Sequence, residues 1–304
     1  MQNNRRTSRH INGILLLDKP INITANFALQ AVKRLYAAKK AGHTGSLDPL
    51  ATGMLPICFG EATKFSQFLL DSDKRYWVIA QLGVKTTTGD AEGDVVAQRP
   101  VLEYSASQLE ATFDKFRGDI EQVPSMYSAL KHQGRPLYEL ARQGITIERA
   151  ARPVHIYDLK LLDRTLDTLI LDITCSKGTY IRTLVEDIGE VLGCGAHVHT
   201  LRRLNAGPYQ EQQMITLPQL ESLAQTGDYS ALDACLLPID TAITGWPLMT
   251  VSEAAFYYLR RGQPVILPHA PTSGWVRLNL HDGKFLGVGE ILDDGRVAPR
   301  RLVV

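Results

Sequence analysis

The sequence predicts an α+β protein, in which a mixed, largely antiparallel sheet is flanked by helices and followed by a small C-terminal β-barrel. Before about residue 246, strand-like and helix-like segments are mixed without the regular spacing of a parallel βαβ protein. After it, the chain changes to short strands separated by Asp-Gly turns. We therefore expect a large domain at 1–245 and a small one at 246–304, which is close to the smallest size that folds alone.

The large domain is expected to begin with a strand, a helix and a second strand. The apolar run "INGILLLDKP" predicts a strand that ends at Pro20. "RYWVIAQLG" alternates apolar and polar residues as a half-buried strand does, with Tyr76 near its start. Between them, Thr24 is expected to cap a helix that extends to about Lys40, because apolar side chains recur there at helical spacing: Phe27, Ala31, Val32 and Leu35.

Two helices and a buried strand are expected in the middle of the chain. Ser107 and Glu110 have capping-box spacing at the start of a helix that Gly118 would end. The β-branched run "TLILDITC" predicts a strand, and "GTYIRTLVEDIGEVLG" predicts a helix closed by Gly193. The C-terminal part begins with a short helix, "SEAAFYYLRRG", and continues as hairpins with turns at 281–283 and 293–295.

Charge and cysteine content narrow the classes of function. The net charge is +1, but residues 211–259 hold six acidic side chains and no Lys or Arg, so the rest carries all 33 basic residues against 26 acidic ones. This asymmetry allows a basic binding face. The four cysteines are far apart and form no C-x-x-C pair, which argues against a zinc site and favours thiols of a reducing compartment. The run "ILLL" is too short for a signal peptide or a membrane span, so we expect a cytoplasmic protein without a membrane partner.

The segment "AGHTGSLDPLATG" holds one acid, Asp48, and one imidazole, His43, among glycines, hydroxyls and a proline. The glycines allow tight turns, and Pro49 biases Asp48 toward an extended backbone that fixes its direction. A carboxylate on such a loop suits nucleophilic or general-base chemistry, although the commonest role of an isolated Asp is to cap a turn. No Ser–His pair or second carboxylate is nearby, which disfavours a protease or an ordinary glycosidase.

The segment "CSKGTYIRTLVEDIG" places Arg182 in the first turn of a predicted helix. A cation there opposes the helix dipole, so it is expected to serve a group outside the helix. Its best partner is a buried carboxylate held by two parallel hydrogen bonds, and the alternative is an ordinary surface arginine.

A third segment, at about 121–152, combines basic and aromatic side chains. Such a combination can bind phosphates and stack on bases, and the alternative is an amphipathic helical hairpin on the surface. The basic residues are Lys131, Arg135, Arg142, Arg149 and Arg152, and they are interleaved with Tyr127, His132 and Tyr138.

Together these segments resemble the bacterial TruB-type tRNA pseudouridine-55 synthases over almost the whole chain. The resemblance rests on "LLLDKP", "AGHTGSLDPLATGMLPICFGEATKF", "DKRYWVIAQLG", "PSMYSALKHQGRPLYELARQG", "CSKGTYIRTLVEDIGEVLGCGAHV", "LRRL" and "FLGVGEILDDGRVAPRRLVV". It implies a pseudouridine-synthase fold for the catalytic domain and a PUA-like RNA-binding barrel at the C-terminus. The implied activity is isomerisation of a uridine in the TΨC loop of tRNA after the base is flipped out, without a cofactor or metal.

The resemblance also implies roles for individual residues. Asp48 matches the catalytic aspartate, and Arg182 matches the arginine paired with it. Tyr76 matches the tyrosine that stacks on the target base and is the candidate for removing its C5 proton. Three roles remain open for Asp48: attack on the sugar, attack on the base, or removal of a sugar proton. Other residues match positions that contact the substrate or support the site. His43 matches the histidine that contacts the substrate loop, and Tyr180 and Leu201 match residues that line the uracil pocket. Lys19 and Pro20 match the "KP" pair that supports the site.

The chain departs from the family pattern at two points. After the "KP" pair, the usual Gly and Thr/Ser-Ser are replaced by "INITAN", in which Asn22 tolerates unusual backbone angles nearly as well as Gly. In "TTTGD", Thr87 stands where the family has an acid, while Asp90 is retained. Any role of the missing acid is therefore not carried over.

The expected partner is tRNA, bound at its TΨC stem-loop by the large domain and at its acceptor arm by the C-terminal domain. Arg296, Arg300 and Arg301 are the candidate phosphate contacts of that domain. A monomer without a protein partner is expected. One alternative is a tRNA-binding folding factor (RNA chaperone) with catalysis secondary, which basic segments and an RNA-binding barrel alone would also fit. The other is a guide-RNA-dependent relative, against which the long basic insertion argues.

Overall fold

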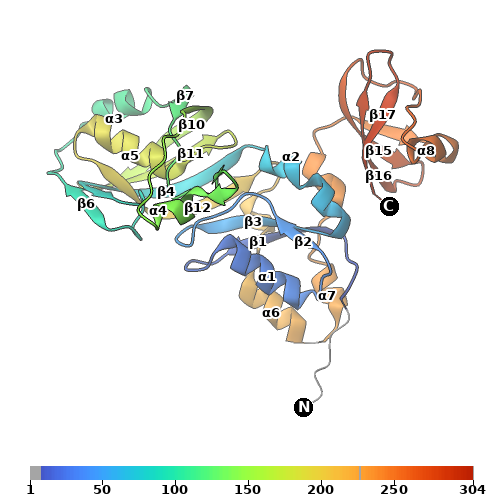
Figure 1. The fold of residues 1–304 in the computed structure, drawn as a ribbon, viewed down its shortest axis with the longest axis horizontal. Coiled ribbons are helices and arrows are strands. Elements are labelled where there is room, and N and C mark those ends of the chain that lie inside the picture. The colour runs from blue at the N-terminus through green and yellow to red at the C-terminus, as the bar shows by residue number, and fades with distance from the viewer. Residues whose placement is uncertain (1–7, 226, 304) are drawn as a thin grey trace.

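The computed structural model describes residues 8–225 and 227–303, in which the two largest sheets have nine and four strands and two further sheets are two-stranded (Figure 1). The large sheet has nine strands: β1 (Gly13–Lys19), β2 (Ala41–His43), β3 (Thr52–Phe59), β4 (Lys74–Leu82), β7 (Gly118–Gln122), β10 (Arg152–Arg164), β11 (Thr168–Cys175), β12 (Ala196–Ala206) and β13 (Ile215–Thr216). Their order is β13-β1-β3-β12-β4-β11-β10-β7, with β2 paired to β3 beside this path.

The pairing of these strands is mostly antiparallel. Only β1 with β13 and β3 with β12 run parallel in this sheet. The pairing of β3 with β12 is short and joins Thr52 and Gly53 of β3 to Arg202 and Arg203 of β12. The predicted mixed, largely antiparallel sheet is therefore confirmed.

Helices flank the large sheet (Figure 1). Near one end, α5 (Ile181–Leu192) packs along β12, and α3 (Ala106–Phe113) packs against α5. Near the other, α1 (Ala25–Leu35) packs against β2 and against α6 (Leu217–Gln225), which contacts α7 (Tyr229–Asp233). None of the helices in the described ranges is long and apolar enough to cross a membrane.

Strand β1 shows why the run "ILLL" has no polar alternation. Leu15 and Leu17 enter the main core with Leu55 and Ile57 of β3. Ile14 and Leu16 point to the opposite face, where a second core includes Phe65, Ala206 and Ile243 as well. A strand that is covered on both faces needs apolar residues at every position.

Helix α1 ends earlier than the sequence predicts. Thr24 is its N-cap, with Oγ1 accepting from Phe27 N at 3.1 Å, as expected. The helix stops at Leu35 instead of about Lys40, and Ala37 adopts a φ of +46°. The predicted extension was wrong because tertiary contacts compete with the helical hydrogen bonds: Lys39 N donates to Arg9 O at 2.9 Å, and the buried Tyr36 hydroxyl donates to Leu232 O at 2.7 Å.

Helix α3 begins two residues before the expected position. Its capping box is formed by Ser105 and Gln108, whereas Ser107 and Glu110 were predicted. The two pairs have the same spacing, and the observed one turns Leu109 and Phe113 into the core. Gly118 does not end this helix; it follows a turn and starts β7 with a φ of +80°. By contrast, α5 is closed by Gly193 in a left-handed conformation, as predicted.

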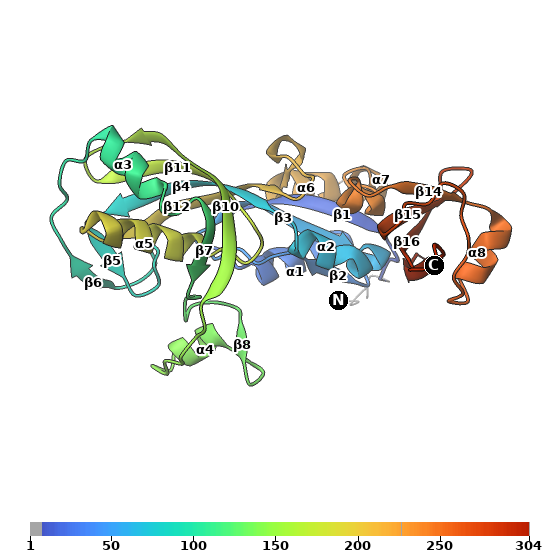
Figure 2. The ribbon, with the colours of Figure 1, turned by 90° about the horizontal axis from the view of Figure 1, so that it is seen from above.

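The insertion at 121–152 projects from the body between β7 and β10 (Figure 2). It contains a hairpin of β8 (Lys131–His132) and β9 (Arg135–Pro136), followed by the short helix α4 (Leu137–Ala141). The alternative of a helical hairpin is therefore wrong for this segment. Met126, Leu137 and Leu140 form a small core of its own.

The small sheet at the C-terminal end has the order β14 (Leu248–Val251), β15 (Gly274–Leu280), β16 (Phe285–Ile291) and β17 (Val297–Leu302), with α8 (Glu253–Leu259) beside it. Gly283 and Gly295 take positive φ in the two predicted hairpin turns. Aromatic rings join this unit to the segment that follows β3, which contains a 3-10 helix (Gly60–Phe65) and α2 (Ser66–Leu70). These rings are Phe65, Phe68, Trp246, Trp275 and Phe285.

Candidate active site

The candidate acid, Asp48, lies on the loop that joins the antiparallel strands β2 and β3. Ala51 N donates to Asp48 O at 3.1 Å and closes a turn. The carbonyl of Pro49 accepts from Asn22 N at 2.9 Å and from Lys19 Nζ at 3.3 Å. These bonds tie the Asp48 loop to the end of β1.

Lys19 and Pro20 lie beneath this loop. Lys19 is fully buried, and its Nζ also donates to the carbonyls of Pro20 at 2.8 Å and Ile23 at 2.7 Å. Burial lowers the Lys19 pKa to about 8, against the opposing charge of Asp48. Asn22 adopts a φ of +66°, which is the left-handed conformation expected for the "INITAN" turn.

Arg182, the second residue of α5, faces Asp48. Its Nε lies 3.0 Å from Asp48 Oδ2, and the two side chains are 7% and 40% exposed. The rest of the guanidinium is held by main-chain carbonyls: Nη1 donates to Thr88 O and Nη2 to Tyr127 O, both at 2.7 Å. The cation is therefore fixed in direction, while the carboxylate remains accessible to a ligand.

A second carboxylate, Asp90, lies on the other side of Arg182. Its Oδ2 is 3.6 Å from Arg182 Nη1, and the Asp90 side chain is 5% exposed. Asp90 Oδ1 accepts from Thr88 Oγ1 at 2.6 Å and from Glu92 N at 3.1 Å. No role was predicted for Asp90 from the sequence, because a carboxylate in a Thr- and Gly-rich turn resembles an ordinary turn residue.

Thr87, which replaces the family's acid, stabilises a turn. The turn joins β5 (Val84–Thr86) to β6 (Val95–Gln98). Thr87 N donates to Asp94 O at 2.9 Å, and Thr87 Oγ1 accepts from Asp94 N at 3.1 Å. The substitution therefore leaves the contacts of Asp90 with Arg182 in place.

Burial and neighbouring charges act on Asp48 in opposite directions. Burial raises its pKa above the usual range, and Asp90 adds to this effect. Arg182, followed by Lys19, opposes the rise. The charge of Arg182 thus favours the ionised form of a carboxylate that burial would otherwise neutralise.

Tyr76 and Leu201 come from neighbouring strands of the sheet. They lie on β4 and β12, which pair with Val78 opposite Leu201 and Tyr76 opposite Arg203. Tyr76 is 9% and Leu201 6% exposed. Burial raises the Tyr76 pKa, and the charge of Arg203 and a hydrogen bond from it act in the other direction. The charge of Asp48 also raises the Tyr76 pKa, so the two groups are close enough to interact electrostatically.

Tyr180 is the N-cap residue of α5 and is half-buried. Gln122, at the end of β7, holds its main chain from both sides: Tyr180 N donates to Gln122 Oε1 at 2.9 Å, and Gln122 Nε2 donates to Tyr180 O at 3.3 Å. Asp48 and Arg182 both act on the Tyr180 hydroxyl electrostatically. Sequence reasoning did not identify Gln122, which carries no pattern of its own.

His43 ends β2 and is half-buried. Its Nδ1 is buried without a hydrogen-bond partner in the described structure. Burial, with help from the charge of Arg203, lowers its pKa, so the neutral ring is favoured.

The basic side chains of the insertion are held much less tightly. Lys131, Arg135, Arg142 and Arg152 are exposed, and Arg149 is half-buried. The guanidinium of Arg142 lies 5.7 Å from the centre of the Tyr138 ring. The insertion nevertheless reaches the site through the carbonyl of Tyr127, which binds Arg182.

The three candidate phosphate contacts of the C-terminal unit each have a local partner. Arg296 binds Asp294 at 2.6 Å, and Arg300 binds Glu290 at 2.6 Å. Arg301 lies 5.9 Å from the ring centre of Phe68. The first two are exposed ion pairs, which contribute little to stability and leave the arginines able to exchange partners.

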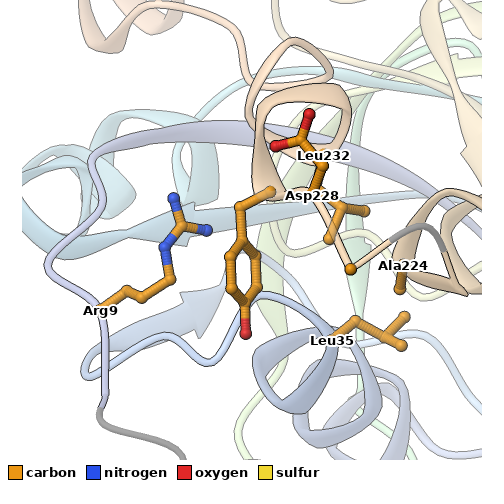
Figure 3. A pocket seen from close by; sticks show the side chains of 7 residues that line it. Arg9, Leu35, Ala224, Asp228 and Leu232 are labelled. Carbon is orange, nitrogen blue, oxygen red and sulfur yellow. The ribbon is translucent and has the colours of Figure 1, made fainter.

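A cavity of about 330 Å³ lies apart from these residues, between the N-terminal segment, α1 and α6–α7 (Figure 3). Arg9 reaches over the ring of Tyr229 at 4.0 Å and forms an ion pair with Asp233. None of the predicted site residues lines this cavity. Within the two described ranges, no group of three or more His, Cys, Asp or Glu side chains is arranged to hold a metal ion.

The groups around Asp48 are of the kinds that act chemically on a bound substrate. They include an accessible carboxylate, a fixed cation beside it and a tyrosine that is largely buried. Leu201 and Tyr180 add an apolar and an aromatic surface. Such a set suits a reaction in which one acid acts on a group that stays bound throughout.

Comparison with known sequences identifies three consecutive family models. Residues 33–181 match the N-terminal domain of the TruB family of pseudouridylate synthases, and residues 182–244 match the tRNA pseudouridylate synthase B C-terminal domain. Residues 247–303 match the C-terminal model of pseudouridine synthase II TruB. Together the matches extend from residue 33 to residue 303, and strand β1 precedes them.

Similar curated proteins are named tRNA pseudouridine synthase B. The protein of Stutzerimonas stutzeri is 57% identical over 299 residues, covering 98% of both chains. The protein of Coxiella burnetii (strain Dugway 5J108-111) is 56% identical over 295 residues, covering 97% of this chain and 96% of the relative.

Two solved structures of multi-component complexes contain a chain with a similar fold. A chain from "Structure of H/ACA RNP bound to a substrate RNA containing 2'-deoxyuridine" has a TM-score of 0.73 and 20% identity over 96% of this chain and 85% of that one. A chain from "Crystal Structure of a Cbf5-Nop10-Gar1 Complex" has a TM-score of 0.71 and 22% identity over 96% and 83%. These likenesses establish the pseudouridine-synthase fold. The family models and the 56–57% identity to curated relatives show that the chain belongs to the TruB family of pseudouridylate synthases.

Proposed function

We propose that the protein isomerises uridine to pseudouridine in tRNA, at position 55 of the TΨC loop. The observation that carries this proposal is the pair of Asp48 and Arg182, 3.0 Å apart, in a member of a pseudouridylate synthase family. One side of the carboxylate is accessible, and the other faces a guanidinium fixed by two carbonyls. The names of the curated relatives support tRNA as the substrate.

The reaction exchanges one bond of the same base for another. The C1′–N1 bond breaks, the uracil turns within the site, and a C1′–C5 bond forms. The proton lost from C5 is balanced by the proton gained at N1, so no water, cofactor or second substrate is consumed. This balance explains why a single accessible carboxylate is sufficient.

Each side chain has a part in this proposal. The target base is stacked inside a folded RNA loop, so it is flipped out before Asp48 can reach it. His43 contacts the substrate loop, and Tyr76, Tyr180 and Leu201 enclose the uracil. Tyr76 takes the C5 proton, and Arg182 keeps Asp48 ionised. Lys19 and Pro20 support the Asp48 loop from below.

The insertion and the C-terminal unit supply binding surface. The exposed cations of the insertion neutralise phosphates of the TΨC stem-loop, and the C-terminal unit extends the contact to the acceptor arm. The insertion also favours a stand-alone enzyme over a guide-RNA-dependent one, because it would allow the protein to bind its tRNA directly.

The test is pseudouridine mapping on a tRNA transcript that lacks modifications. Purified protein alone is expected to convert U55 completely. In a control transcript that carries C55, no other uridine of the T arm should be modified. Conversion of another uridine, or a requirement for a second RNA, would contradict the proposed position or the stand-alone mechanism.

A further inference from the structure

Arg203, in β12, is a buried cation that the roles above leave unused. It is 2% exposed, and its neighbour Arg202 forms an ion pair with Asp18 at 2.8 Å. The described part of the chain offers Arg203 no such carboxylate within 4.0 Å. Its guanidinium instead binds main-chain carbonyls: Nε donates to Met54 O at 2.7 Å and Nη2 to Gly45 O at 3.0 Å.

These two carbonyls lie at opposite ends of the loop that carries Asp48. Gly45 lies near its start, and Met54 belongs to the strand that follows it. The main chain of Arg203 also pairs with Gly53 in the short parallel ladder. Gly53 has a φ of +94°, and a Cβ there would lie 2.3 Å from Arg203 O, so only glycine permits this approach. One residue thus holds both ends of the Asp48 loop.

Arg203 also faces the hydroxyl of Tyr76. The antiparallel register of β4 and β12 places the two residues directly opposite each other, so their side chains lie on the same face of the sheet. The other ionisable groups that act on Tyr76 are Cys175 of β11 and Asp48, and both raise the Tyr76 pKa. Arg203 supplies the positive charge that opposes them and the effect of burial.

We propose that Arg203 is a positioning residue for pseudouridine formation, which fixes the Asp48 loop at both ends and holds a positive charge against the Tyr76 hydroxyl. The inference rests on the proposed function, in which both groups act on the uridine. A buried guanidinium without a carboxylate partner is costly, and it is retained where its charge stabilises negative charge nearby. Here that charge is the phenolate of Tyr76 that accepts the C5 proton.

Three variants of the full-length protein separate these contributions. Arg203→Met removes the charge, Arg203→Lys keeps the charge but loses the planar fork, and Arg202→Lys is the control on the same strand. The measurement is single-turnover pseudouridine formation at saturating tRNA, from mildly acidic to alkaline pH, beside tRNA binding. We expect Arg203→Met to lower the rate by about 100-fold, the scale of a misplaced catalytic group, with binding within about twofold.

The pH dependence distinguishes this role from general support of the fold. Without the cation, the Tyr76 pKa rises further, so the alkaline side of the pH profile, which follows ionisation of Tyr76, should shift to higher pH in Arg203→Met than in the parent. Arg203→Lys should restore the parent's pH profile at a reduced rate. Arg202→Lys should match the parent in both its rate and its pH profile.

Two results would overturn the proposal. One is a parental rate and pH profile in Arg203→Met; if that variant does not fold, the same result in Arg203→Lys is decisive. The other is a reduced rate with an unshifted pH profile in both variants, which is the result of a purely structural role. Asp48→Asn is assayed alongside: activity in that variant would refute the proposed function itself, whereas its inactivity beside parental Arg203 variants would refute only this inference.

Discussion

The Asp48 site and the basic insertion hold their charges in opposite ways. Around Asp48, the cations Arg182, Arg203 and Lys19 are buried, and each donates to a main-chain carbonyl of another element or loop, of Tyr127, Met54 and Pro49 respectively. In the insertion, Lys131 and Arg142 are exposed on a unit with only a small core. Fixed charges suit a transition state whose geometry is defined, while exposed charges suit a flexible polyanion. From this difference we expect the chemical step to depend on the first region and affinity for tRNA on the second.

Asp48→Asn should lower the rate of pseudouridine formation more than any other substitution considered, and it should affect only the chemical step. The amide keeps the size of the side chain but loses its charge and nucleophilicity. We expect single-turnover pseudouridine formation to fall by a few thousandfold, which corresponds to about 5 kcal/mol of transition-state stabilisation. Filter binding of the same tRNA should be retained or tighter, because a negative charge is removed.

The same variant decides between the enzyme and the RNA-folding factor. A folding factor would need Asp48 only for the shape of its loop. The Asn variant of such a protein would act on tRNA as the parent does, and any pseudouridine formation would continue at a near-normal rate. Lost binding would mean that Asp48 maintains the loop and does not react.

Arg182→Met should show the next largest effect and should also leave binding intact. It removes the cation beside Asp48 and leaves the carbonyls of Thr88 and Tyr127 without their donor. We expect a loss of about 1,000-fold in single-turnover rate. Arg202→Met, which removes a cation paired with Asp18 elsewhere on the sheet, is the matched control. Equal losses in the two variants would show that loss of any ion-paired arginine of this domain matters and that the Asp48 pair has no special role.

The pH dependence of the rate sharpens the assignment of Asp48. Burial raises the Asp48 pKa above its ordinary value, and the ionised form is the reactive one in the proposed mechanism. The rate should therefore fall about tenfold per pH unit as pH decreases through this raised pKa, whereas ionisation of Tyr76 governs the alkaline side of the profile. Rates measured at saturating tRNA test this, and a rate that stays constant down to the ordinary pKa of an aspartate would contradict the burial effect.

The insertion should govern the salt dependence of tRNA binding. Lys131→Ala/Arg142→Ala removes two exposed cations outside its small core. We expect affinity to fall about tenfold, with a decrease of about one in the log–log salt slope for each lost phosphate contact. Lys115→Ala/Arg164→Ala removes the same charge from the body and should leave the slope unchanged. An unchanged slope in the first variant would show that these side chains do not touch the RNA backbone.

The C-terminal unit should make the smallest contribution. Truncation near Pro247 would uncover the aromatic cluster of Phe65 and Phe68, so substitutions are the cleaner test. Arg296→Ala/Arg300→Ala is expected to raise KM for full-length tRNA about two- to threefold and to leave an isolated TΨC stem-loop unaffected. An equal loss with both substrates would place the effect on stability or on the active site.

Local patterns were sufficient to predict much of the fold. The β1 and β11 runs, the Thr24 cap, the Gly193 closure and the Asp-Gly hairpin turns are written in neighbouring residues. The errors occur where two local solutions compete. Ser105 and Ser107 offer the same capping box two residues apart, and the end of α1 depends on contacts with Arg9 and Leu232.

The site was predictable only where one residue looked unusual in its own segment. Asp48 and Arg182 did, as a lone acid in a loop and a cation at a helix start. Asp90, Gln122 and Arg203 did not, because each has an ordinary type for its element. Their importance comes from contacts across the sheet, such as the bonds from Arg203 to Gly45 and Met54. Such contacts have no signature along the chain.

One contact joins the two regions and makes their separation a strict test: Arg182 Nη2 donates to the carbonyl of Tyr127 in the insertion. The decisive measurement is the single-turnover rate of Lys131→Ala/Arg142→Ala as a function of protein concentration in excess over tRNA. If chemistry and affinity are separate, the curve should shift to higher concentration and reach the parental plateau. A lowered plateau at saturation would show that the insertion sets the geometry of Arg182 and Asp48, and would contradict the division of roles.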